Sequence, residues 1–311
     1  MKNMGTVFLF GAGASYGSDS QNTPPLGDRL FDELRRFNPG GWGAITGSLA
    51  DQFQRDFEEA IKFIKPQALA PLQRAMAAYF FEFMPSNSSL YFKLAHQIAR
   101  TKGWTGAVCT LNYERLLEIS FKNAGLQLLT AQPAAGKAGV EICFPHGCCH
   151  FFCNSVKGSA GEVSFNGFRV QTDGPVIEIH DPNQHQLRIR QDAFPPVISY
   201  FEPRKRTTAG CSFIQKQRGR WRELALGATT IVIVGLRVRP HDEHVWTTIA
   251  ATSARIVYCG GRSGASEYRS WAATARSGRV DRILDGYFQD EFDSICGEAG
   301  ILMINSGNQG Q

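Results

Sequence analysis

Short apolar runs that end in polar loops recur along the chain. Val, Ile, Leu, Phe and Cys dominate these runs, which occupy residues 7–10, 106–111, 140–144, 230–234 and 256–259. A continuous apolar run bounded by turn residues is typical of a strand buried on both faces of a parallel sheet. After several of these runs, apolar residues recur every three or four positions, as in a helix. The pattern therefore predicts an α/β fold, a Rossmann-like parallel sheet flanked by helices.

Between the first and second of these runs the pattern changes to helical spacing. From Gly27 to about Lys102, apolar residues recur every three or four positions, as in Leu30, Leu34 and Phe37. Prolines and the glycine-rich residues 38–41 interrupt the pattern, because proline cannot continue a helix interior. We expect an inserted helical module whose aromatic residues form a core.

A different pattern occupies residues 150–192, where apolar and polar residues alternate among glycines, as at residues 163–165 and 176–179. This stretch predicts a small β-rich module or long loops. The expected organisation is a Rossmann-like domain formed by residues 1–29, 103–149 and 193–300, a helical insertion at 30–102, a β-rich module at 150–192 and a polar tail at 301–311.

Composition limits the class of protein. The chain has 311 residues, of which 43% are hydrophobic, as in ordinary globular proteins. No apolar run is long enough to cross a bilayer, and the first residues lack a signal-peptide pattern, so we expect no membrane contact and a cytoplasmic protein. Eight scattered cysteines, several inside apolar strands, favour reduced and buried thiols over disulfides.

Basic residues gather in one stretch although the formal net charge is only +5. Between Arg204 and Arg222 there are seven Lys or Arg residues and no acidic residue. Such a stretch can meet a phosphate-bearing ligand, a nucleic acid or an acidic partner. No nucleic-acid motif or interleaved aromatic residue supports those interpretations, so a solvated helix face is favoured.

The first strand leads into a glycine-rich turn. Residues 11–15 are Gly-Ala-Gly-Ala-Ser, and Gly17 follows. Glycines allow a tight turn and a close approach to a pyrophosphate, and a following helix supplies amide donors. The spacing departs from G-x-G-x-x-G, and glycine turns after a first strand also occur without a ligand. On its own, the turn leaves both interpretations open.

Two polar residues follow later strands. Asn112 offers a donor and an acceptor at a strand end, and His146 can accept a proton near neutral pH. Each has a structural alternative, since Asn112 can cap the next helix and His146 can be a loop residue before Gly147. In an open parallel sheet, ligands bind at the carboxyl ends of the strands, where all these loops are expected to meet.

The order of these motifs resembles the sirtuin-like family. The matching segments are residues 11–15, Thr-Leu-Asn-Tyr-Glu at 110–114 in place of the family's T-x-N-x-D, His-Gly at 146–147, and Gly-Leu-Arg at 235–237 in place of G-x-S.

The resemblance implies that the chain binds NAD, which serves as its substrate. In the family the first loop holds the pyrophosphate of NAD, which implies the same role for residues 11–15 here. The resemblance also implies that Asn112 contacts the nicotinamide ribose and orients the attacking water or carbonyl. It implies that His146 is the general base. Further cofactor contacts are implied for the later loops. Together the implied cofactor residues are Gly11, Ala12, Gly13, Ser15, Gly235, Asp242 and Gly260.

The departures from the family matter equally. Sirtuin deacylases carry a G-I-P-x-F-R segment, but residues 23–28 are Thr-Pro-Pro-Leu-Gly-Asp. They also carry two C-x-x-C pairs for zinc. Here Cys148, Cys149, His150 and Cys153 form one cluster without a second pair, and adjacent cysteines are poor joint ligands, so no metal is expected. Arg237 replaces a small hydroxyl residue, which makes the local phosphate or ribose contact uncertain.

The helical insertion and missing zinc pairs resemble the bacterial anti-phage defence branch, which hydrolyses NAD. The expected activity is an NAD glycohydrolase releasing nicotinamide and ADP-ribose, the effector of an abortive-infection system. That resemblance implies a homo-oligomer or a hexameric helicase-type ATPase partner. The alternatives are an NAD-dependent protein deacylase or ADP-ribosyltransferase, and a non-catalytic module that senses NAD or ADP-ribose.

Overall fold

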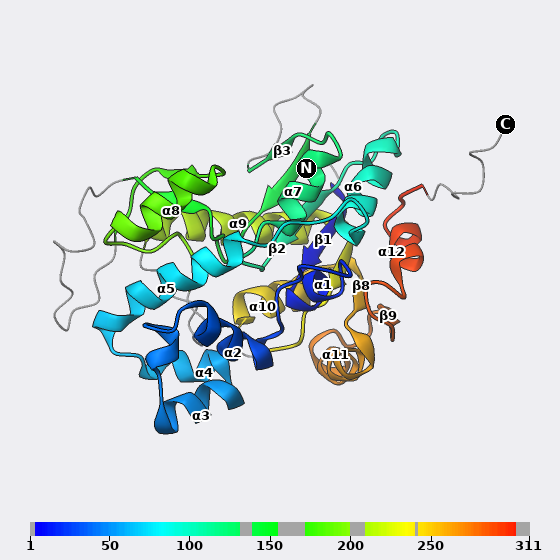
Figure 1. Cartoon of the computed structure of the whole chain (residues 1–311). Coiled ribbons are helices and arrows are strands. Elements are labelled where there is room, and N and C mark those ends of the chain that lie inside the picture. The colour runs from blue at the N-terminus through cyan, green and yellow to red at the C-terminus, as the bar shows by residue number, and fades with distance from the viewer. Residues whose placement is uncertain (1–3, 131–138, 155–171, 200–208, 240–241, 303–311) are drawn as a thin grey trace.

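A parallel sheet forms the centre of the protein. The computed structural model describes residues 4–130, 139–154, 172–199, 209–239 and 242–302. In this part of the chain the sheet has seven strands, in the order β3-β4-β2-β1-β7-β8-β9, all parallel (Figure 1). The strands are β1 Met4–Phe10, β2 Ala107–Thr110, β3 Leu128–Leu129, β4 Val140–Cys143, β7 Ala228–Val234, β8 Arg255–Cys259 and β9 Arg282–Leu284. The predicted Rossmann-like fold is confirmed.

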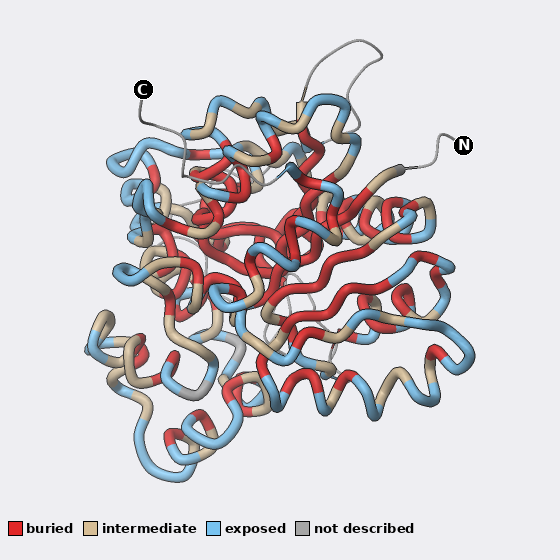
Figure 2. Tube along the Cα trace, turned by 90° about the vertical axis from the view of Figure 1, so that its right-hand side faces the viewer, coloured by how far each residue is buried: buried red, intermediate tan, exposed pale blue. Residues whose placement is uncertain are grey.

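Alternation along the strands divides the core into two layers. On β1, Phe8 and Phe10 belong to one buried cluster, and Val7 and Leu9 belong to the other. All four are fully buried because side chains alternate between the faces of a strand and both faces are covered. Figure 2 shows buried residues along the central strands and exposed residues around them.

One face of the sheet is covered by three helices of the second half of the chain. They are α9 Cys211–Gly227, α10 Glu243–Ala251 and α11 Gly261–Ala275. Trp221, Trp246 and Tyr268 from these helices pack with Leu9 in the same cluster. Tyr268 stacks on Tyr258 of β8 with ring centroids 4.4 Å apart.

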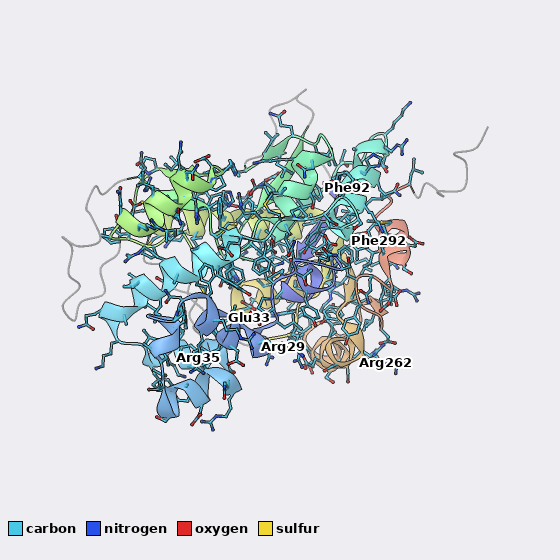
Figure 3. All side chains as sticks on the ribbon, in the orientation of Figure 1. Arg29, Glu33, Arg35, Phe92, Arg262 and Phe292 are labelled. Atoms are coloured by element: carbon cyan, nitrogen blue, oxygen red, sulfur yellow. The ribbon has the colours of Figure 1, made fainter. Side chains whose placement is uncertain are left out.

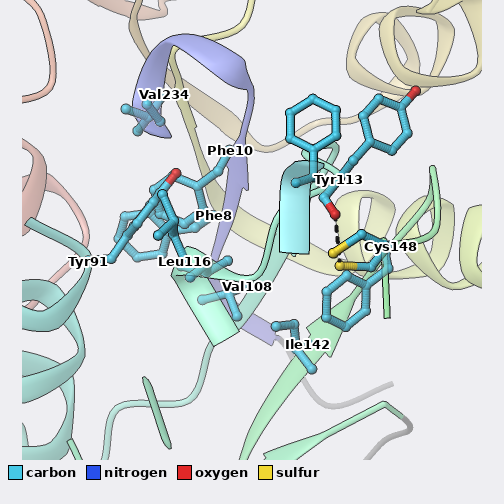
Figure 4. Packing of buried hydrophobic residues seen from close by; sticks show 14 of the residues in the cluster. Phe8, Phe10, Tyr91, Val108, Tyr113, Leu116, Ile142, Cys148 and Val234 are labelled. Carbon is cyan, nitrogen blue, oxygen red and sulfur yellow. Dashed lines mark hydrogen bonds between the residues drawn. The ribbon is translucent and has the colours of Figure 1, made fainter. Parts of the chain in front are cut away.

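The other face packs against helices from the middle and the end of the described chain. Tyr91 of α6 Leu90–Arg100, Leu116 of α7 Leu116–Asn123 and Ile295 of α12 Phe292–Glu298 belong to the same cluster as Phe10. Figure 4 shows Tyr91 and Leu116 beside Phe8, Phe10 and residues of neighbouring strands.

The predicted helical module is present beside the sheet (blue to cyan in Figure 1). Leu30, Phe31 and Leu34 form the buried side of α2, whereas Arg29 is exposed and Glu33 partly exposed (Figure 3). Phe31 stacks on Phe53 with centroids 4.8 Å apart, which confirms the aromatic residues as core. The helices of this module are α2 Gly27–Phe37, α3 Gly47–Arg55, α4 Phe57–Ala60, α5 Pro66–Phe81 and α6, with two short 3₁₀ turns, η1 Trp42–Ala44 and η2 Ile61–Phe63; the short helix α1 Ala12–Tyr16 precedes them, directly after β1.

A second sheet contains two antiparallel strands, β5 Phe151–Cys153 and β6 Val176–Glu178. Helix α8, Pro182–Gln191, follows them, so the interpretation of residues 150–192 as strands and loops was incomplete. Asp181 accepts a hydrogen bond from the Gln184 backbone and caps this helix. The strand-like pattern noted at residues 163–165 lies outside the described residues.

Two further observations concern the expectations from composition. Every helix in the described ranges is too short or too polar to cross a bilayer. All eight cysteines are free thiols.

Candidate functional site

The sheet reverses its winding at β1. The chain runs from β1 to β2 and β4 on one side, and later from β7 to β8 and β9 on the other. The crevice at the carboxyl ends of β1 and β7 is the place where doubly wound sheets bind ligands. The predicted loops after β1, β2, β4 and β7 therefore belong to the same edge of the sheet.

Three of the predicted glycines join the loops after β1 and β7. The Gly11 N–H donates to the Val234 carbonyl, and the Gly13 N–H donates to the Gly235 carbonyl, both at 2.9 Å. Gly235 has φ of +67°, and a Cβ there would lie 1.9 Å from the Ala14 nitrogen. These glycines are therefore required for close contact between the loops, and Ala12 is the exposed residue of the turn.

Asn112 is held against the glycine loop. Its Nδ2 donates to the Gly11 carbonyl at 3.2 Å and to Ser15 Oγ at 2.8 Å, and the residue is buried. Both amide hydrogens are therefore engaged inside the protein, and Oδ1 is the polar atom that the side chain can still offer. The alternative interpretation of Asn112 as a helix cap does not describe these contacts, because Arg115 is the residue that precedes α7.

Ser15 is the centre of a buried hydrogen-bond cluster. Its hydroxyl donates to Glu114 Oε1 at 2.6 Å and contacts the Tyr91 hydroxyl at 2.9 Å. A serine has one hydrogen to donate, so Tyr91 must be the donor to Ser15. Burial raises the pKa of Tyr91 well above its ordinary value, which keeps that hydrogen in place. We call Ser15, Tyr91, Asn112 and Glu114 the Ser15 cluster.

His146 follows β4, the neighbour of β2 in the sheet. Its Nε2 lies 3.1 Å from His244 Nε2 and 3.5 Å from Asp242 Oδ1, and its side chain is buried. Asp242 precedes α10, yet its carboxylate makes no capping hydrogen bond to that helix. The predicted residues His146 and Asp242 are thus brought together, with His244 as a third member.

The backbone around His146 is fixed by neighbouring segments. Its carbonyl accepts the Ser199 N–H at 2.8 Å, and Tyr113 packs on its ring with centroids 6.4 Å apart. Gly147 has φ of +75°, and a Cβ there would lie 1.9 Å from the Val197 carbonyl oxygen. The imidazole is therefore held by packing on more than one side.

The loop after β8 reaches this edge through Gly235, whose N–H donates to the Cys259 carbonyl at 2.8 Å. Gly260 precedes α11, and a Cβ there would lie 2.6 Å from the Tyr258 hydroxyl. Arg237 forms an ion pair with Glu267 of α11. A surface hollow of about 530 Å³ beside it is lined by Val238, Ser263, Ser266, Glu267 and Ser270.

The basic stretch is not a uniformly solvated helix face. Arg218 donates to the Pro145 carbonyl at 3.2 Å and to Ser199 Oγ at 3.0 Å. Arg220 forms an ion pair with the buried Glu141. These two arginines hold α9 against the sheet, whereas Lys216 and Arg222 are exposed. Residues 204–206 lie outside the described part of the chain.

The site also contains residues that sequence reasoning missed. His244 lies two positions after Asp242, but only the packing of α10 brings it to His146. Tyr91 comes from the helical segment, where an aromatic residue at helical spacing indicates core. Glu114 was noted as a motif position, and its role as the acceptor for Ser15 appears only in three dimensions.

Fold and site together define a doubly wound α/β protein with a polar, histidine-containing edge. Among solved structures, a mutant Sir2 homologue in complex with ADP-ribose is similar over 95% of this chain and 92% of that chain, with 14% identity and a TM-score of 0.49. Sir2 bound to acetylated peptide is similar over 96% and 94%, with 16% identity and a TM-score of 0.45. A Sir2 homologue–NAD complex covers 95% and 89%, with 14% identity and a TM-score of 0.44. No protein-family model and no curated protein matches the chain.

Proposed function

We propose that this protein is an NAD glycohydrolase that cleaves the bond between nicotinamide and ribose. The observation that carries the proposal is the pair of side chains after neighbouring strands. Asn112 is held at the glycine loop, and His146 is buried beside His244 and Asp242. The order of the motifs in the sequence supports the same assignment.

In the proposed complex the pyrophosphate lies at the turn after β1. The amides of Gly11, Gly13 and Ala14 donate within the protein, so the exposed Ala12 is the residue of the turn best available to the ligand. Gly235 and Gly260 shape the adjoining loops, and Ser15 Oγ fixes Asn112 by accepting a hydrogen bond from its amide. In this proposal NAD therefore binds mainly to the backbone of the turn after β1 and of the adjoining loops, which the internal hydrogen bonds already hold in place.

The reaction requires a positioned water and stabilisation of a cationic ribose. Asn112 Oδ1 accepts a hydrogen bond from that water, and the fixed amide holds it near the anomeric carbon. Nicotinamide leaves with the electron pair of its bond to ribose, and the water oxygen bonds to the anomeric carbon. His146 accepts the proton that the water loses, directly or through a ribose hydroxyl, and the carboxylate of Asp242, 3.5 Å away, favours the resulting imidazolium. Burial of His146 excludes bulk water and strengthens these electrostatic effects.

The proposal includes control of the activity, because unrestrained hydrolysis would deplete cellular NAD. A role in anti-phage defence, with a second copy of the chain or a hexameric helicase-type ATPase as the regulator, is the form of control that the motif resemblance suggests. Mixing the purified chain with such an ATPase and measuring nicotinamide release tests this part separately.

The direct test of the reaction is a product analysis. Purified protein is incubated with NAD, with and without an acetylated peptide, and nicotinamide and ADP-ribose are separated by chromatography. Equal amounts of both products without peptide support the glycohydrolase. Release only with peptide supports a deacylase, and NAD binding without release supports a sensing module.

His146→Ala tests the proposed base. The variant should release nicotinamide at least about 100-fold more slowly, because general acid–base groups contribute about that much, while it still binds NAD. His96→Ala, on the exposed side of α6, is the matched control and should keep the wild-type rate. Wild-type activity in His146→Ala contradicts the assigned role.

A further inference from the structure

Four side chains from three separate segments meet beside α7. Glu118 comes from α7, His150 directly precedes β5, Glu178 ends β6, and His180 follows two residues later. One nitrogen or carboxylate oxygen from each lies within 4.8 Å of those of the others. His150 Nε2 is 3.1 Å from Glu118 Oε2, and His180 Nε2 is 3.1 Å from Glu178 Oε2.

Two buried atoms at the centre of this group face each other. Among the described residues, the buried His150 Nε2 and Glu118 Oε2 pair with each other at 3.1 Å and have no further hydrogen-bond partner. His150 is fully buried, and the Glu118 side chain is 5% exposed. Because the two atoms point at each other, an ion that enters between them gains a nitrogen and a carboxylate oxygen as ligands.

The other ring nitrogen of His150 is already held. Its Nδ1 lies 3.1 Å from Cys148 Sγ, and the Cys148 thiol donates to the Tyr113 carbonyl at 3.2 Å (Figure 4). The sulfur is therefore the acceptor and Nδ1 carries a hydrogen, so Nε2 is the ring atom that can bind a metal ion, with release of its own proton. Orientation of a histidine through its second nitrogen is the usual arrangement behind a metal ligand.

The donor set selects the class of ion. Two imidazole nitrogens and two carboxylate oxygens suit zinc and similar first-row transition metals, whereas calcium and magnesium prefer oxygen ligands alone. Glu178 and His180 are 40% and 44% exposed, so an ion can enter from solvent. We propose that Glu118, His150, Glu178 and His180 bind one divalent transition-metal ion, of the zinc class, which fastens α7 to the β5–β6 sheet.

This proposal revises the expectation that the chain binds no metal. That expectation considered His150 together with Cys148, Cys149 and Cys153, and not with Glu118, Glu178 and His180. In the structure Cys148 contacts the Nδ1 atom of His150 and is not one of the proposed ligands. It is also independent of the proposed reaction, since none of the four residues belongs to the Asn112 or His146 contacts.

Lys122 is the main competitor for the same space. Its Nζ lies 2.6 Å from Glu118 Oε1 and 3.3 Å from His180 Nε2, and its side chain is 43% exposed. Because it is exposed, the amine can leave when an ion binds. Lys122→Met should therefore bind zinc several-fold more tightly than the wild type, which a purely structural ion-pair network does not predict.

The test uses the full chain stripped with a chelator and then dialysed against Zn²⁺, with bound metal measured by mass spectrometry and affinity by calorimetry. We expect one Zn²⁺ per chain at this site. His180→Ala and Glu178→Ala should each weaken that binding at least about tenfold. Both ligands are partly exposed, so these variants should fold. His96→Ala and Glu223→Ala are exposed controls and should keep the wild-type affinity.

A second measurement locates the ion. Co²⁺ in the proposed site should give the visible absorption of a nitrogen- and oxygen-ligated ion, and His180→Ala should remove it. The proposal is overturned if Zn²⁺ and Co²⁺ do not bind stoichiometrically. It is also overturned if His180→Ala and Glu178→Ala bind as the wild type does, or if only His244→Ala removes the ion, because His146, Asp242 and His244 form a separate candidate group.

Discussion

Glu114 and Glu118 lie four positions apart in the sequence and are both buried, yet their surroundings shift their pKa values in opposite directions. Burial raises the pKa of Glu114, and hydrogen bonds from Ser15 and the Leu116 and Asn112 groups only partly oppose it. Burial also raises the pKa of Glu118, but the hydrogen bonds and charges of His150 and Lys122 have a larger and opposite effect, so the pKa falls to about 2. Glu114 accepts hydrogen bonds mainly from neutral donors and serves as a positioning acceptor, whereas Glu118 lies beside His150 and Lys122 in a group of charged side chains.

The largest loss of stability should follow from removing Glu118 from the charged group that it forms with His150 and Lys122. In the metal-free protein, Glu118→Ala leaves His150 buried without its carboxylate, and loss of one partner of a buried pair costs about 3 to 5 kcal/mol. Glu178→Ala removes a carboxylate that is 40% exposed and should cost less than about 1 kcal/mol. Urea unfolding with a chelator present compares them, and equal losses would remove the distinction made by burial.

The second largest loss of stability should follow from a substitution in the Ser15 cluster. Ser15→Ala leaves hydrogen-bonding atoms of Asn112, Glu114 and Tyr91 without their partner, which should cost about 2 to 3 kcal/mol of unfolding free energy. Ser20→Ala, at an exposed position, provides the reference in the same urea experiment. If the two variants lose the same amount, the cluster does not contribute as described.

A third effect is expected at His185, the buried residue of α8. Burial, together with the nearby charges of Arg115 and His150, lowers its pKa to about 4, although its hydrogen bond to the Cys149 carbonyl acts in the opposite direction. Its ring stacks on Phe81 with centroids 3.7 Å apart. As the pH falls below about 6.5, the unfolded state takes up a proton first, so stability is lost until about pH 4.

The size of this loss should be about 2 to 3 kcal/mol, from about 1.4 kcal/mol per pKa unit. His185→Gln keeps a donor for the Cys149 carbonyl and removes the titration. The unfolding free energy should fall between pH 7 and pH 4 in both proteins, and the fall should be smaller in the variant by that amount. The same pH dependence in both proteins would show that His185 is not the responsible group.

The smallest effect is expected at Arg237. Its ion pair with Glu267 joins side chains that are 51% and 35% exposed. Arg237→Ala should therefore change the unfolding free energy by less than about 1 kcal/mol. A loss comparable with that of Glu118→Ala would contradict the contrast between exposed and buried pairs.

The sequence predicted the central strands well for a physical reason. β1, β2, β4, β7 and β8 are buried on both faces, so their apolar runs are continuous and easily recognised. β3 and β9 have two and three residues, which is too short for a periodic pattern. In α8 only His185 is buried, and the pair Asp181-Pro182, a cap followed by a first-turn proline, was the available signal.

The candidate site could be predicted where chemistry follows a strand, as for Asn112 and His146. It could not be predicted where contact depends on packing between distant segments. His244 meets His146 across 98 positions of the sequence, and Glu118 meets His150 from the helix before it. Such groups have no fixed spacing, so no motif identifies them.

The most direct test of the proposed function is the initial rate of nicotinamide release from NAD by the wild type and by Asn112→Ala. We predict release by the wild type and a loss of at least about 100-fold in the variant, with folding retained because the two hydrogen bonds of the Asn112 side chain together contribute about 1 to 3 kcal/mol. Ser20→Ala should match the wild type. Equal rates in the wild type and Asn112→Ala would contradict the proposed site.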